Sequence, residues 1–176
     1  MSNTNGILSE IHSRLRPECD RVEFMPKGLA FLLSLDPEQP DPKVFGTVTL
    51  DTCSPVPDAP IQLLTVEFLV FQDLPAPLPE QTLFRLHELS GMALFGTLMV
   101  NREGQLCYRY TCAVNEYDAP QTAQLFELIC YEMLLFLNCH YEYLFLCVTN
   151  PKQMTTGEYL QHLVSSAQKE SEGSYA

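Results

Sequence analysis

The segment from Ala119 to Cys139 constrains the fold more than any other part of the chain, because its apolar side chains occupy more than one face of a helix. Its centre reads AQLFELICYEMLLFL, residues 123–137. At 100° per residue, one stripe suited to packing on a sheet contains Phe126, Ile129, Met133, Phe136 and Leu137. The remaining apolar side chains spread over much of the other surface, and they are Leu125, Leu128, Tyr131 and Leu135. This second group needs a cover, either the chain's own C-terminal helix or another protein surface.

Composition narrows the function classes. The 176 residues are 46% hydrophobic and 18% charged, which predicts one globular domain. The formal net charge of −12 argues against binding to nucleic acid or to an anionic membrane, since both depend on clustered Lys and Arg. No basic residue occurs in 44–84 or 110–151, so a basic partner is conceivable alongside a plain role in solubility. Glu127, Glu132 and Asn138 interrupt the longest apolar run, and we therefore expect no membrane span.

The cysteines predict neither disulfides nor a metal site. There are seven, most of them inside apolar runs, and the chain starts with the polar segment MSNTNG, so we expect reduced thiols in a cytoplasmic protein that react slowly in the native state. Cys107 and Cys112 are five positions apart, which places them on opposite faces of a strand. Cys130 and Cys139 are about half a rotation apart on a helix.

No local motif predicts an enzyme or a cofactor site. Ser90-Gly91 lacks the flanking residues of a nucleophile elbow, and the eight glycines are too scattered to form a phosphate-binding loop. Glu127 and Glu132 lie too far apart around a helix to form a carboxylate pair by themselves. The four histidines show no ligand spacing. We therefore expect a non-enzymatic protein without metal or cofactor.

The first half of the chain predicts a helix followed by three strands. Residues 6–15 carry apolar side chains at helical spacing, and the helix ends at Arg16-Pro17. Apolar and polar residues alternate in GLAFLLSLD, VFGTVTL and IQLLTVEFLVF, which predicts half-buried strands. The proline-rich stretches PEQPDP and SPVPDAP between them predict loops.

The second half predicts a helix, a hairpin, the long helix and a terminal helix. Residues 80–90 form the first helix, and residues 92–100 and 105–114 form a hairpin around NREG, in which Gly104 can take positive φ. The long helix starts at Asp118 or Ala119 with Pro120 in its first turn and ends near Cys139, before YLFLCV and a loop at NPKQM. The terminal helix covers about 156–168. A single domain of residues 1–170 with a flexible polar tail of residues 171–176 follows from these boundaries.

These elements predict an α+β fold: an antiparallel five-stranded sheet with helices packed on it, in the order α-βββ-α-ββ-α plus an extra C-terminal helix. The order resembles that of type III secretion chaperones and the related YbjN family of bacterial proteins, over about residues 5–141. The resemblance is carried by LFRLHELSGMALFGTLMVNREGQLCYRYTCAV followed by QTAQLFELICYEMLLFL. It implies a non-enzymatic acidic protein, commonly dimeric, that binds other polypeptides or acts as an adaptor.

The sequence leaves two function hypotheses, one based on the apolar surface of the long helix and of the helix at residues 80–90, and one based on a pocket. In the first, the protein is chaperone- or adaptor-like, binds polypeptides and forms a homodimer, with an interface formed by Leu83, Leu86, Leu125, Leu128, Tyr131 and Leu135. In the second, it is a small-molecule sensor or an enzyme whose pocket lies between the sheet and the long helix, lined by Tyr108, Tyr110, Tyr131 and Glu132.

Overall fold

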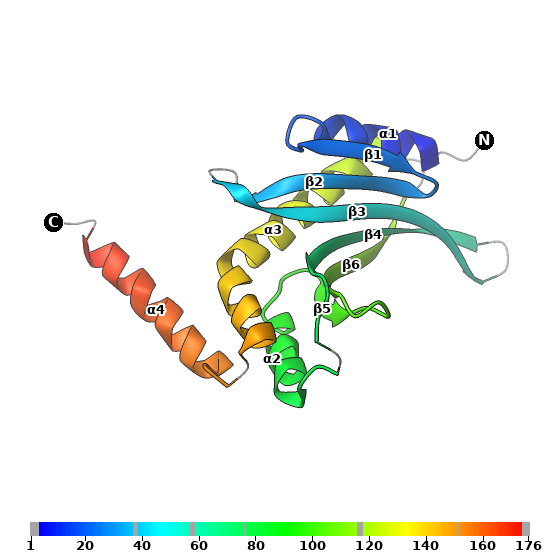
Figure 1. Ribbon diagram of the computed structural model, residues 1–176. Coiled ribbons are helices and arrows are strands. Elements are labelled where there is room, and N and C mark those ends of the chain that lie inside the picture. Colours follow the sequence, from blue (N-terminus) through cyan, green and yellow to red (C-terminus); the bar gives the residue numbers. More distant parts are fainter. Residues whose placement is uncertain are drawn as a thin grey trace.

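One antiparallel sheet organises the molecule (Figure 1). The computed structural model describes residues 4–36, 39–56, 59–75, 77–115, 118–150 and 152–173. Its elements are, in chain order, α1 (Thr4–Leu15), β1 (Arg21–Met25), β2 (Gly28–Asp36), β3 (Gln39–Val56), β4 (Ala59–Phe71), α2 (Glu80–Ser90), β5 (Thr97–Val100), β6 (Leu106–Val114), α3 (Ala119–Thr149) and α4 (Thr156–Gly173). The strands lie in the order β1-β2-β3-β4-β6-β5, and every neighbouring pair is antiparallel. The predicted α+β class is therefore correct.

The prediction of five strands was wrong, because the described residues form six. The additional strand is β1, which pairs with the start of β2 at one edge of the sheet. Its sequence, RVEFM, lacks the alternation that reveals a half-buried strand, since an edge strand has only one neighbour and Phe24 stays 61% exposed. The element order is thus α-ββββ-α-ββ-α-α.

Strands β3 and β4 are longer than their sequence predicts. β3 begins at Gln39 and ends at Val56, and β4 begins at Ala59, so most of the two proline-rich stretches is extended strand rather than loop. The φ of proline, near −65°, is compatible with extended backbone where no ladder hydrogen bond is required. The two strands project beyond the rest of the sheet as a hairpin arm (Figure 1).

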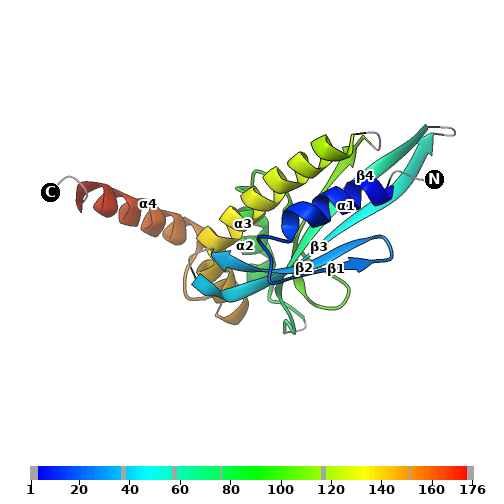
Figure 2. The same ribbon diagram turned by 90° about the horizontal axis from the view of Figure 1, so that it is seen from above.

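Helices α1 and α3 pack against the same face of the sheet (Figure 2). Predicted alternation is confirmed on this face, where the buried strand residues are Leu29, Phe31, Leu33, Leu35, Val44, Val48, Leu50, Leu64, Val66, Phe68 and Val70. The predicted stripe of α3 is buried against them. Phe31 makes edge-to-face ring contacts with Phe68, at a centroid distance of 5.8 Å, and with Phe126 of α3, at 6.2 Å. These rings join sheet and helix into one core.

Two glycines have positions that require them. A Cβ atom on Gly46 would lie 2.3 Å from the Phe31 ring, so a larger residue would displace the ring from the centre of the core. Gly104 closes the β5–β6 hairpin with a φ of +74°, as predicted from NREG. The first arm of that hairpin is shorter than predicted, because β5 starts at Thr97 and not at Met92.

Helix α3 continues ten residues past its predicted end at Cys139 and includes the whole of YLFLCV. Asp118 caps it as predicted, since its side chain accepts a hydrogen bond from the Gln121 backbone N–H at 3.0 Å. The continuation buries Tyr143, Leu144 and Cys147, which extend the buried stripe at helical spacing. The segment expected to turn away is therefore the C-terminal third of the core helix.

The extended α3 also changes the expectation about membranes. By length and composition alone this helix could cross a membrane, so the exclusion drawn from Glu127, Glu132 and Asn138 does not hold. In the structure, 44% of its most apolar window is buried. The helix serves as the core helix that covers the sheet.

Helix α4 leaves the body of the molecule after its first turn (Figures 1 and 2). Its start is held by a stack of Tyr159 on Tyr143, with ring centroids 4.1 Å apart and planes 3° apart. The Thr156 hydroxyl donates to Glu88 of α2 at 2.6 Å. The helix continues to Gly173, so residues 171–173, expected in the flexible tail, belong to α4, and residues 174–176 lie outside the described residues.

Candidate interaction surfaces

A ridge of three apolar side chains lies on the outer face of α3. Leu128 is 50% exposed, Tyr131 63% and Leu135 46%, and their spacing of three and four residues places them in line along the helix. All three belong to the predicted interface, and Leu125 is half-buried at its border. Helix α4 does not cover this ridge, since it packs against α2 near the opposite end of α3. We call Leu128, Tyr131 and Leu135 the α3 ridge.

The α3 ridge borders a cleft between α1, β2 and α3. The cleft has a volume of about 530 Å³ and is lined by Arg14, Leu15, Pro17, Glu18, Cys19, Leu33, Ser34, Phe126, Glu127, Cys130, Tyr131 and Leu134. Tyr131 belongs to both the cleft and the ridge, so the convex and the concave apolar surfaces are continuous. This volume lies within the roughly 300–1,000 Å³ range of ligand pockets.

One cationic side chain spans the rim of this cleft. Arg14 of α1 donates to Glu127 of α3 at 2.6 Å and to Glu10 at 3.2 Å. The hydrogen bond to Glu127, and to a smaller extent the one to Glu10, raises the pKa of Arg14 above its ordinary value. The ion pairs fix α1 against α3 and hold the rim in place. Because Arg14 is already paired with two carboxylates, a ligand that enters the cleft meets more negative than positive charge at the rim.

Two thiols, those of Cys19 and Cys130, line the same cleft, and neither is activated as a nucleophile. Burial, followed by the charges of Glu18 and Asp20, raises the pKa of Cys19 to about 11. Burial also raises the pKa of Cys130 well above its ordinary value. Both groups are thus neutral thiols near pH 7, and they contribute small apolar surface rather than a nucleophile.

The predicted residues of α2 do not join the α3 ridge. Leu86 is buried within the chain, with 4% of its surface exposed, so its assignment to an interface was wrong. Leu83 is 48% exposed. However, the Thr82 hydroxyl beside it donates to the Cys147 carbonyl, 19 residues along α3 from Leu128, which corresponds to about 28 Å of helix. The structure therefore gathers Leu125, Leu128, Tyr131 and Leu135 on one helix and leaves Leu83 elsewhere.

The structure does not bring Tyr108, Tyr110 and Tyr131 together around the pocket that was expected between the sheet and the long helix. Tyr108 is buried in the core, where its hydroxyl donates to the Phe95 carbonyl and burial raises its pKa. Tyr110 packs against Phe95, with ring centroids 5.2 Å apart, while Tyr131 points outward from α3. Tyr131 instead lines the cleft between α1, β2 and α3.

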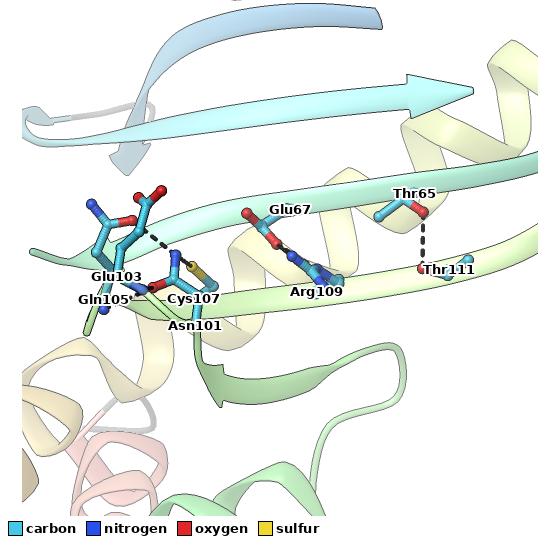
Figure 3. A network of polar contacts seen from close by, with 8 residues as sticks. All are labelled: Thr65, Glu67, Asn101, Glu103, Gln105, Cys107, Arg109 and Thr111. Atoms are coloured by element: carbon cyan, nitrogen blue, oxygen red, sulfur yellow. Dashed lines mark hydrogen bonds and ion pairs between the residues drawn. The ribbon is translucent and has the colours of Figure 1, made fainter. Parts of the chain in front are cut away.

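The second face of the sheet carries a row of polar pairs (Figure 3). Glu67 of β4 and Arg109 of β6 are direct register partners and form an ion pair, and Thr65 and Thr111 are joined by a hydrogen bond of 3.0 Å. The alternation in each strand predicted a wet face here, but not the pairs, because pairs depend on the register between β4 and β6.

The β5–β6 turn extends this polar row (Figure 3). The Asn101 side-chain oxygen accepts hydrogen bonds from the backbone N–H groups of Glu103 and Gln105, each at 3.0 Å. Its amide donates to the Gln105 side chain at 2.9 Å and to the Cys107 sulfur at 3.6 Å. These contacts account for the turn itself, and each polar group in them already has a partner within the chain.

Among the described residues, no group of three or more His, Cys, Asp or Glu side chains could hold a metal ion. Every buried side-chain nitrogen or oxygen in that part of the chain has a hydrogen-bond partner. No protein-family model, curated protein or solved structure matches the chain.

Proposed function

We propose that this is a non-enzymatic, chaperone- or adaptor-like protein that binds other polypeptides and self-associates through the α3 ridge. The observation that carries the proposal is the ridge itself, in which three large apolar side chains in line along α3 stay about half exposed, while another stripe of the same helix is buried against the sheet. Such contiguous exposure on a soluble protein marks interaction sites. The order predicted from the sequence resembles that of YbjN and secretion-chaperone proteins of bacteria, and this resemblance agrees with the proposal; the structure adds β1 to that order.

A second copy of the chain is the proposed cover of the α3 ridge. A two-fold contact uses the same surface on both subunits. Leu128, Tyr131 and Leu135 of each subunit would therefore be buried in the dimer interface. Full burial of one Leu side chain contributes roughly 1.5–3 kcal/mol. We place this dimer in the cytoplasm, since Cys107, Cys130 and Cys147 are buried free thiols that pack as small apolar groups.

Replacing two ridge residues with charge tests the dimer. We expect light scattering at micromolar concentration to give about 40 kDa, twice the 20.0 kDa of the chain, and about 20 kDa for the Leu128→Glu/Leu135→Glu variant. Both side chains are exposed, so the variant keeps its circular dichroism spectrum. Ile61→Glu, an exposed apolar site on the hairpin arm, is the matched control and stays dimeric. A mass of 20 kDa for the unmodified protein contradicts self-association.

The cleft between α1, β2 and α3 favours a second candidate function, a sensor of small apolar molecules. Its 530 Å³ volume and its lining by Leu33, Phe126 and Leu134 suit an apolar ligand. A thermal-shift screen of metabolites would then give a ligand that raises the melting temperature of the native protein. Cys19→Met, which extends a side chain into the cleft, should abolish that shift. A flat response across the screen contradicts the sensor.

A further inference from the structure

A separate groove runs beside α4. Tyr159 anchors the first turn of α4, where its hydroxyl donates to the Cys139 carbonyl at 3.0 Å and lies 2.7 Å from His140 Nδ1. Beyond this turn α4 diverges from the body (Figures 1 and 2). The resulting groove has a volume of about 480 Å³ and lies between α4, residues 138–142 of α3, and the ends of β2 and β3 that face them.

The walls of this groove combine aromatic and apolar side chains with negative charge. Tyr141 and Tyr159 contribute rings, and Leu35 and Leu163 contribute apolar surface. Glu142, an exposed residue of α3, and Asp36, at the end of β2, contribute carboxylates, and His162 of α4 contributes an imidazole. Among the residues whose side chains the structure describes, none that lines the groove is Lys or Arg. An occupant that complements the groove therefore needs an apolar part for the walls and a cation for Glu142.

We propose that the groove binds an arginine side chain of a partner polypeptide, with its methylene groups against Tyr141 and Leu163 and its guanidinium at Glu142. A guanidinium stacks on tyrosine rings and pairs with a carboxylate through two parallel hydrogen bonds, which favours arginine over lysine. Another copy's α3 cannot supply the cation, because α3 contains neither Lys nor Arg. The inference rests on the proposed function, that the protein binds polypeptides, and assigns the partner segment a basic and apolar composition.

Matched peptides test this proposal on the full-length protein. The probes are three fluorescein-labelled nine-residue peptides that repeat leucine, glycine and one variable residue three times, the variable residue being arginine, serine or glutamate. We expect fluorescence anisotropy to show binding of the arginine peptide at least about tenfold tighter than the serine peptide, with no binding of the glutamate peptide. Binding of the arginine peptide should weaken as salt increases. Equal affinity for all three peptides, or no binding of the arginine peptide, overturns the proposal.

Variants locate the binding site. Glu142→Gln should weaken binding of the arginine peptide by about threefold to fivefold, the upper part of the range for an exposed ion pair. Leu163→Ser should weaken it without a change in charge. Glu103→Gln, in the β5–β6 turn, removes the same charge outside the groove and should leave the affinity unchanged. An equal loss in Glu103→Gln and Glu142→Gln shows a general effect of net charge and overturns the site.

The Leu128→Glu/Leu135→Glu variant separates this inference from the proposed dimer. Its ridge lies outside the groove, so it should bind the arginine peptide with unchanged affinity as a monomer. Loss of peptide binding in this variant, with its fold retained, contradicts a groove that acts within one chain. A native protein that is monomeric but binds the arginine peptide overturns the dimer and leaves the groove supported.

Discussion

Single side chains decide how the cysteines behave. The seven thiols divide by exposure: Cys53 and Cys139 are exposed, Cys19 and Cys112 are half-buried, and Cys107, Cys130 and Cys147 are buried. Burial raises the pKa of the Cys107 thiol to about 11, so this group is protonated at neutral pH as well as inaccessible. The exposure of Cys53 and Cys139 therefore replaces the expectation of uniformly slow reaction with a prediction of rapid reaction at these two residues. Cys139 lies within a largely apolar run of sequence, but on α3 it shares an exposed face with Asn138, so that run does not bury it.

Thiol labelling of the native protein should therefore be biphasic. We expect two equivalents of a maleimide to react rapidly at pH 7, at Cys53 and Cys139, with the buried thiols reacting only after denaturation. The Cys53→Ser/Cys139→Ser variant should lose the rapid phase and keep its fold, since both sites are exposed. Mass spectrometry of the labelled peptides assigns the sites. Rapid modification of Cys130 in this variant would show that the cleft beside α1 opens in solution.

At the scale of elements, one half-buried histidine, His140, contributes to the attachment of α4. With the Tyr159 hydroxyl donating to the Cys139 carbonyl, the 2.7 Å contact leaves His140 Nδ1–H as donor to the Tyr159 oxygen. Burial lowers the pKa of His140 below its ordinary value of 6.5. Below about pH 6.5 the unfolded chain binds this proton more readily than the folded chain does, so the folded state loses stability as the pH falls.

Urea unfolding at pH 7.5 and pH 5.5 tests this dependence. Between these values we expect the native protein to lose more unfolding free energy than His140→Gln, because the variant lacks the titrating ring. His162→Gln, an exposed position on α4, is the control and should follow the native protein. Most carboxylates titrate below this range, so they add little to the difference. The same loss in His140→Gln as in the native protein would contradict the role of His140.

The elements also show what local sequence patterns can and cannot predict. Alternation placed the core face of β2, β3, β4 and β6 correctly because each of these strands has one apolar and one wet face. The end of α3 was missed because Asn138, Cys139 and His140 form a polar break in an apolar run. On the helix, Asn138 and Cys139 lie on its wet face and His140 is half-buried beside Tyr159, so the break does not interrupt the buried stripe.

At the scale of the whole molecule, local sequence patterns could not predict which distant elements contact one another. Leu83 and Leu86 are one helical turn apart and equally apolar, yet only Leu86 is buried, because α2 faces β5 and α3 with one side. The direction in which α4 leaves the body depends on the Tyr143–Tyr159 stack, which joins residues 16 apart across a turn. Likewise, the clefts beside α1 and α4 exist only once three elements have come together, and no single segment indicates them.

The strand order has a consequence for how the chain folds. Strands β1 to β4 form a meander in which each strand pairs with the next one in sequence, and β5 pairs with β6 across a short turn. Among the described strands, only β4 and β6 pair without being consecutive, and their pairing brings together residues about 35 to 50 positions apart. The two local parts of the sheet can form early, whereas this seam must close a long loop at an entropic cost. Closure of the β4–β6 seam is therefore the step expected to limit the folding rate.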